Sequence, residues 1–331
     1  MHRIRQAGVI LLVGGTLAGA AVAATSGTNL ALVAYSTPKA AYSQLIPAFQ
    51  KTAAGKDVTF SQSYGASGTQ SQLILRGLKA DVAMFSLYPD MQRLVKPGIV
   101  AANWNKDKYH GMVTDSVVVF SVRPGNPKHI KSWNDLIRPG VEIVTPNPFT
   151  SGGARWNIMA IYGSQIRAGK SEAQAQDFVK QVIANTSVQD DSARDSLNTF
   201  SSGKGDVLVG YENEAIQAQQ EGVKLDYVTP ASTILIENPI AVTEDSQNAE
   251  VADKFLKYAY SDEGQQLFAD AGYRPVVKSV FEKNKDKFPI PPGLFTIDDL
   301  GGWSKVNDEF FDPDTGTFAK IENEAGVSTD K

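Results

Sequence analysis

Short apolar runs alternate along the chain with segments whose apolar residues recur at helical spacing, and a small polar turn separates the two. Residues 29–34 form one such run, and helical spacing follows it over 39–49. Comparable units begin near residues 57, 141 and 187. Because strands and helices alternate, the pattern favours an α/β fold with mostly parallel strands.

Each unit carries a serine, threonine or glycine where its strand ends and its helix begins. Ligands of open α/β sheets bind beyond the carboxyl ends of the strands. The first N–H groups of a helix lack partners within it and carry partial positive charge, so an anion can bind there. One serine at such a position is more often a simple helix cap. Four such turns in one chain indicate an anion site, with Ser36 or Thr37 in the first turn, Ser67 in the second, Ser151 in the third, and Ser192 and Ala193 in the fourth.

Two further apolar segments, 114–127 and 232–245, are predicted to cross between two lobes. The lobe inserted between these crossings is expected to span 118–232. The other lobe then consists of 28–117 and 233–303, and 304–331 forms a C-terminal tail. A lobe that is joined through two strands can move as on a hinge, so we expect the lobes to close on a ligand.

The N-terminal residues have the composition of a secretory signal. Arg3 and Arg5 precede an apolar stretch over 7–20, and a small-x-small pattern follows at 21–23. We expect a signal peptide over 1–23, because the apolar stretch is too short and too rich in glycine to anchor the chain. The 331 residues carry a net charge of −4 and include no cysteine, so neither a lipid anchor nor a disulfide is expected.

Candidate catalytic residues are sparse. A serine hydrolase needs a histidine base, and after the signal only His110 and His129 remain, each flanked by lysine and turn residues. The string at 65–69 ends in threonine where a nucleophile elbow needs glycine. Metal and nucleotide motifs are missing, and the lysines form no basic stripe. We therefore expect no enzyme, metal, cofactor or nucleic-acid partner, with a secreted hydrolase using Ser151 or Ser67 as the alternative.

Five strings of residues together resemble the periplasmic sulfate-binding proteins of ABC-type sulfate importers. They are QSYGASGTQ at 62–70, TPNPFTSGGARWN at 145–157, GDVLVGYENEA at 205–215, YSDEGQQLFADAGYRPV at 260–276 and LFTIDDLGGW at 294–303. The resemblance implies a two-lobe type II periplasmic-binding fold, with two mixed sheets flanked by helices. It also implies a monomeric receptor in the periplasm that binds sulfate and delivers it to membrane permease subunits.

The resemblance further implies a set of anion contacts from both lobes, made through hydroxyls and backbone N–H groups. These contacts come from Ser36, Ser67, Ser151, Gly152, Gly153, Ala193 and Tyr211. Tyr211 stands where the resemblance predicts tryptophan, and Ser36 where it predicts aspartate. Arg155 and Arg194 would brace the loops without touching the ligand. On this interpretation Ser151 is a hydrogen-bond donor and not a nucleophile.

Thiosulfate, molybdate and phosphate are alternative ligands, because the sequence does not reveal the radius of the binding cage. Phosphate near pH 7 keeps a proton and needs an acceptor, whereas sulfate only accepts hydrogen bonds. The implied contact set holds no carboxylate, so we expect sulfate to bind at least about a hundredfold more tightly than phosphate. The phenol oxygen of Tyr211 is the group in this set that could accept that proton.

Overall fold

The computed structural model describes residues 27–327 and residue 329, and the predicted signal peptide over 1–23 lies outside the described residues. The strands are β1 (Asn29–Tyr35), β2 (Thr59–Gly65), β3 (Val82–Met84), β4 (Met112–Val122), β5 (Ile143–Pro146), β6 (Thr186–Asp190), β7 (Val207–Tyr211), β8 (Asp226–Val228), β9 (Ser232–Val242), β10 (Arg274–Pro275) and β11 (Gly293–Phe295).

The helices follow the strands in alternation over most of the chain. The α-helices are α1 (Lys39–Gln50), α2 (Ser67–Leu75), α3 (Tyr88–Val95), α4 (Gly152–Arg167), α5 (Glu172–Ala184), α6 (Ala193–Ser201), α7 (Glu212–Gln220), α8 (Ala249–Ala259), α9 (Asp262–Asp270), α10 (Lys278–Asn284), α11 (Gly302–Val306) and α12 (Thr317–Glu324). Two 3-10 helices, η1 (Trp133–Ile137) and η2 (Asp298–Leu300), and one π-helix, η3 (Asn307–Phe311), complete the set.

The strands form one hydrogen-bonded path in the order β2-β1-β3-β9-β4-β7-β5-β6. At one end β1 pairs in parallel with β2 and β3, which we call the first strand group. At the other end β5 pairs in parallel with β6 and β7, the second strand group. Antiparallel pairing of β9 with β3 and β4, and of β4 with β7, connects the groups. The predicted α/β fold is confirmed, and its mixed sheets are joined through β4 and β9.

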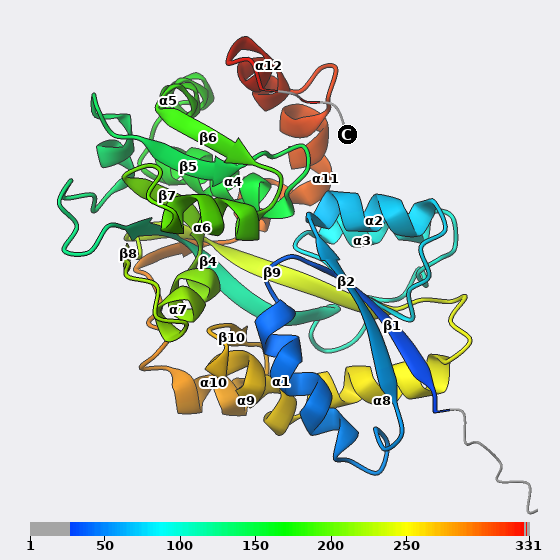
Figure 1. The fold of residues 1–331 in the computed structure, drawn as a ribbon. Coiled ribbons are helices and arrows are strands. Elements are labelled where there is room, and N and C mark those ends of the chain that lie inside the picture. The colour runs from blue at the N-terminus through cyan, green and yellow to red at the C-terminus, as the bar shows by residue number, and fades with distance from the viewer. Residues whose placement is uncertain (1–26, 328, 330–331) are drawn as a thin grey trace, which may run out of the picture.

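The two connecting strands run from one strand group to the other (Figure 1). The first part of β4 pairs with β9, where Val117 lies opposite Leu235, and from Val118 onward β4 pairs with β7. They correspond to the apolar crossings predicted at 114–127 and 232–245. Because each strand is shared, a bend within this pair would move one group relative to the other. The lobe boundaries themselves remain a prediction.

Helices cover both strand groups, with α1, α8 and α9 beside the first group and α4, α5 and α6 around the second (Figure 1). Helix α1 shows why such segments are helical. Its buried residues include Tyr42, Leu45 and Phe49, which fall on one face at helical spacing. The rings of Tyr42 and Phe49 lie 6.2 and 5.1 Å from the ring of Phe255 in α8. The apolar face of α1 is therefore part of the main core.

The described part of the segment expected to form a tail, 304–331, contains the end of α11, η3 and α12, and its aromatic residues pack on α4. The Phe318 ring lies 5.9 Å from that of Tyr162 in α4. The Phe310 ring lies 5.0 Å from that of Tyr162. In Figure 1, α11 and α12 lie at the top of the molecule, near α4 and α5. The described part of this segment is thus integral to the packed fold.

Two features bear on the functional class of the described chain, its helix lengths and its clusters of ionisable side chains. Over 27–327, none of the helices reaches the length and apolarity that a bilayer crossing requires. The same range brings together no group of three or more His, Asp or Glu side chains that could hold a metal ion.

Candidate functional site

The predicted site residues lie in turns at the carboxyl ends of five strands. Ser36 follows β1, and Ser67 is the first residue of α2 after β2 ends. Ser151 directly precedes α4, and Ala193 begins α6. Tyr211 is the last residue of β7 and directly precedes α7. Each residue therefore occupies the strand-to-helix turn at which α/β sheets bind ligands.

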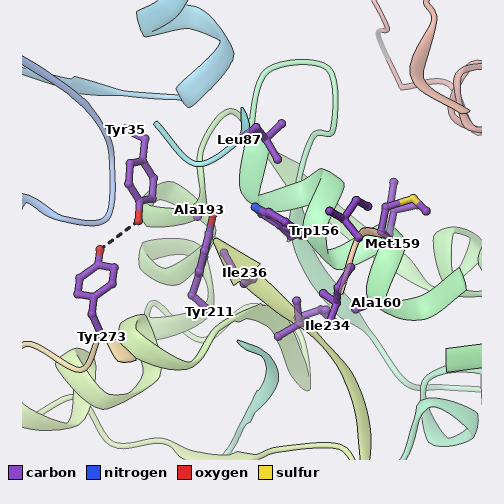
Figure 2. Close-up of a cluster of buried hydrophobic side chains, with 14 of the residues drawn as sticks. Tyr35, Leu87, Trp156, Met159, Ala160, Ala193, Tyr211, Ile234, Ile236 and Tyr273 are labelled. Carbon is purple, nitrogen blue, oxygen red and sulfur yellow. Dashed lines mark hydrogen bonds between the residues drawn. The ribbon is translucent and has the colours of Figure 1, made fainter. Parts of the chain in front are cut away.

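Four of the predicted residues meet at the first turn of α4. A Cβ built on Gly153 would lie 2.7 Å from Cε2 of Tyr211, 3.4 Å from Cβ of Ala193 and 3.4 Å from Oγ of Ser151. Figure 2 shows Tyr211 close to Ala193. Glycine is therefore required at position 153, because any side chain would meet the tyrosine ring. The N–H groups of this first turn have no partner within the helix.

Gly152 meets the first strand group instead. A Cβ at this position would lie 2.7 Å from Oγ of Ser86 and 2.8 Å from Cγ of Leu87. Ser86 follows β3 and is 1% exposed. Sequence analysis missed this residue, although it carries the signal used for the other turns: a serine after an apolar strand and before a helix.

The hydroxyl of Ser67 is already engaged in the described structure. It donates to Oδ2 of Asp90 at 2.6 Å and accepts from the backbone N–H of Ser86 at 3.0 Å. The other carboxylate oxygen of Asp90, Oδ1, is 3.0 Å from NH1 of Arg93. Asp90 is 3% exposed and lies within α3, where no strand-end signal marks it. A buried carboxylate is thus hydrogen-bonded directly to Ser67, one of the predicted contact residues.

Side chains and backbone groups of the two strand groups touch across the site. Nε1 of Trp156 in α4 donates to the carbonyl of Ser86 at 2.9 Å. The N–H of Gly68 in α2 donates to the carbonyl of Thr150 at 3.3 Å. Oγ of Ser86 lies 2.5 Å from the phenol oxygen of Tyr211. In this structure, residues beside the first strand group are therefore in direct contact with residues beside the second.

The Ser36 turn approaches this cluster through neighbouring tyrosines. The rings of Tyr35 and Tyr211 are 6.2 Å apart. Tyr35 donates to the phenol oxygen of Tyr273 at 3.4 Å, the dashed line in Figure 2. Thr37 also lies 2.7 Å from that oxygen. The turn after β1 is thereby tied to Tyr273, and Ser36 itself is half-buried between these anchored neighbours.

The two arginines expected to brace the loops contact loop and helix atoms. Nε of Arg155 donates to the carbonyl of Pro148 at 2.8 Å, and its NH1 donates to Asn307 at 2.8 Å. Burial lowers the pKa of Arg155 to about 10, which leaves it charged at neutral pH. Arg194 lies 3.0 Å from the buried Glu214 of α7. These contacts suit a supporting role, which remains a prediction.

Burial also determines the protonation state of Tyr211. Its side chain is 2% exposed. Burial raises the pKa of Tyr211 well above its ordinary value, and the hydrogen bond with Ser86 opposes this rise only in part. The phenol therefore keeps its proton at physiological pH and can donate a hydrogen bond.

The histidines of the described chain lie on the surface, unlike the site serines. His110 and His129 are both exposed and adopt positive φ angles of 54° and 52° in turns. Ser67 and Ser151 are 2% and 4% exposed. The acidic partner of Ser67 is Asp90, with no imidazole between them, so the arrangement lacks the order of groups that a serine hydrolase requires.

Known proteins are similar to this chain in sequence and in fold. Residues 30–274 match the family described as bacterial extracellular solute-binding protein. A sulfate-binding protein of Synechococcus elongatus is 41% identical over 303 residues, 89% of this chain and 86% of that protein. A thiosulfate-binding protein of Escherichia coli is 34% identical, over 84% of this chain and 87% of that protein.

A solved structure is similar along most of the chain. The sulfate-binding protein SubI of Mycobacterium tuberculosis superposes with a TM-score of 0.84 at 42% identity, over 86% of this chain and all of that one. The chain belongs to the bacterial extracellular solute-binding proteins.

Proposed function

We propose that this protein is an extracytoplasmic receptor that binds sulfate and delivers it to the permease subunits of an ABC importer. The observation that carries the proposal is the convergence of Ser151, Gly153, Ala193 and Tyr211 at the first turn of α4. Each can donate a hydrogen bond through a hydroxyl or a backbone N–H, and sulfate only accepts. The relatives named for sulfate or thiosulfate binding support this ligand class.

Such a site can hold a dianion without a cation in contact with it. A hydrogen bond to a charged group contributes about 1.5–3 kcal/mol. About six of them, opposed by desolvation and by closure, leave about −8 kcal/mol or better, which corresponds to micromolar or tighter binding. The N-termini of α4 and α6 add a favourable dipole. The net charge, −4 for the whole chain and −6 once Arg3 and Arg5 are removed with the predicted signal, therefore does not oppose the proposal.

Ligand binding would favour closure of the two proposed lobes. Ser36 and Ser67 lie beside the first strand group, and Ser151 and Ala193 beside the second. Only the closed state brings donors from both groups to one anion, so binding shifts the population toward it. The shared strands β4 and β9 are the proposed hinge.

Calorimetry on the refolded, anion-stripped protein tests the ligand. We expect sulfate to bind with micromolar or tighter affinity and to displace phosphate, with thiosulfate and molybdate as comparison anions. The absence of heat with sulfate, or displacement of sulfate by phosphate at equal concentration, would overturn the assignment. An assay with aryl sulfate and aryl phosphate esters should show no turnover, and turnover that is lost in Ser151→Ala would favour the hydrolase alternative.

The proposed receptor acts as a monomer in the periplasm, after removal of residues 1–23. Mass spectrometry of the exported protein should find Ala24 as its first residue, without a lipid. An intact Met1 would contradict the cleaved signal. Light scattering should give the mass of a single chain.

A further inference from the structure

The backbone of Ser86 makes three hydrogen bonds with residues outside its own turn. Its N–H donates to Ser67 Oγ at 3.0 Å, and its carbonyl accepts from Trp156 Nε1 at 2.9 Å and from Asn238 Nδ2 at 3.2 Å. These partners come from α2, α4 and β9. The backbone of Ser86 is thus held on both sides by residues of three other elements.

That hydroxyl lies against the first turn of α4. Ser86 Oγ is 2.5 Å from the phenol oxygen of Tyr211, and it is 2.7 Å from the point where a Cβ on Gly152 would sit. The Tyr211 ring stands equally close to the Cβ position of Gly153. The two hydroxyls therefore form one pair, which borders the two glycines whose N–H groups are proposed to bind the anion.

A count of protons shows what this pair can offer. The Ser67 proton lies on the bond to Asp90 and cannot reach an anion at the same time. Ser86 and Tyr211 together hold two hydroxyl protons, and their mutual hydrogen bond uses one of them. The second proton has no acceptor within the pair. Since the phenol stays protonated, this second proton is available to a bound anion at physiological pH.

We infer that Ser86 is a further anion-binding residue, which acts with Tyr211 as a single hydroxyl pair and supplies a donor from the first strand group. This inference rests on the proposed function. It also accounts for a tyrosine at the position where the resemblance predicts tryptophan. The N–H of an indole points in one direction that the ring fixes, whereas the O–H of a phenol can rotate. A hydrogen bond with the Ser86 hydroxyl would orient the phenol O–H of Tyr211.

Sulfate binding by single and double variants tests the pair. Ser86→Ala and Tyr211→Phe should each weaken binding about fivefold or more, because a donor to a charged acceptor is lost or misdirected. The double variant should be weaker by less than the product of the two single effects, since both substitutions remove parts of the same donor. Ser71→Ala is the matched control, because Ser71 is a buried serine whose hydroxyl donates to the Asp90 carbonyl at 2.7 Å.

The control and the wild type separate the possible outcomes. Wild-type affinity in Ser86→Ala, or effects that multiply in the double variant, would overturn the inference while leaving the sulfate receptor intact. Failure of the wild-type protein to bind sulfate would instead overturn the proposed function. If Ser86→Ala does not fold, Ser86→Cys keeps the size of the side chain with a much weaker donor and should show the same loss. Ser71→Ala should alter thermal stability but leave the sulfate Kd unchanged.

Discussion

Adding one methyl group at Gly152 should oppose closure of the protein. In the described structure, the Cβ of Gly152→Ala would lie 2.7 Å from Ser86 Oγ, 2.8 Å from Ser86 Cβ and 2.8 Å from Leu87 Cγ. Ordinary contacts begin near 3.4 Å, so these atoms must separate by about 0.6 Å. Gly152 belongs to α4 and Ser86 follows β3, so the clash arises between the two strand groups.

The size of the effect follows from how little Ser86 can move. Three hydrogen bonds hold its backbone, and Leu87 is 1% exposed. Overpacking of a well-packed site costs about 1–3 kcal/mol, and an anchored neighbour places the cost in the upper part of that range. We expect about 2–3 kcal/mol, which weakens sulfate binding by about 30- to 150-fold. The open state has no such contact and should be unaffected.

Calorimetry combined with small-angle scattering distinguishes this effect from a general loss of folding. Gly152→Ala should bind sulfate weakly and keep a larger radius of gyration than the wild type at the same sulfate concentration. Gly210→Ala is the matched control, because its Cβ would meet nothing closer than Leu208 Cγ at 3.8 Å. If Gly152→Ala binds sulfate and contracts like the wild type, the arrangement described here is not the state that binds the anion.

Three further outcomes are expected. Ser151→Ala should weaken sulfate binding by about 1.5–3 kcal/mol, because the hydroxyl that is proposed to donate to the charged ligand is lost; unchanged calorimetry would remove Ser151 from the site. Asp90→Asn should raise the ratio of sulfate to phosphate affinity about tenfold in competition titrations. Arg93 would keep the amide oxygen of the new side chain, so the amide N–H would face Ser67 and the Ser67 proton would be free to bind the anion. A constant ratio would exclude a role of Asp90 in selectivity. Burial raises the pKa of Glu322 from 4.5 to about 7. The folded state therefore binds the proton more tightly than the unfolded state, which stabilises the fold by at most about 3 kcal/mol below about pH 4.5. This stabilisation is lost as the pH rises from 4.5 to 7. Glu322→Gln should flatten the fall of Tm between pH 5 and 7.5, and an unaltered slope would contradict the assignment.

The parts of the site that could be predicted from sequence are those fixed by local structure. A serine or glycine between an apolar strand and a helix marks the end of that strand wherever the strand lies in the sheet. Ser151 and Ala193 occupy such turns in the structure, as predicted. The parallel order of the strands then brings these turns to neighbouring places. Both steps need only periodicity and the geometry of strand–helix units.

The parts that could not be predicted depend on partners far apart in the chain. Tyr211 and Ser86 are 125 residues apart, and nothing local indicates that their hydroxyls meet. The residue type alone tells whether a side chain can donate a hydrogen bond. The acceptor to which its proton points depends on the residues packed around it. The resemblance implies that Ser67 donates to the ligand, and in the described structure its hydroxyl donates to Asp90, so its contact with an anion stays a prediction. The packing of the predicted tail is a second case, because Phe310 and Phe318 contact Tyr162 of α4, which lies far earlier in the chain.

Selectivity in the proposed site follows from protons more than from charge. Three guanidinium groups near it are paired with carboxylates, Arg93 with Asp90, Arg194 with Glu214 and Arg274 with Glu212, and the buried Arg155 is held by the Pro148 carbonyl and by Asn307. An unpaired cation would attract any anion, but these pairs leave mainly N–H and O–H donors for the ligand. Such donors favour an anion that brings no proton of its own, because a proton facing a donor is left without an acceptor. The Ser67–Asp90 pair is the exception. The Ser67 hydroxyl gives its proton to Asp90, so the Ser67 oxygen can accept the proton of a phosphate. Discrimination against phosphate therefore depends mainly on this pair.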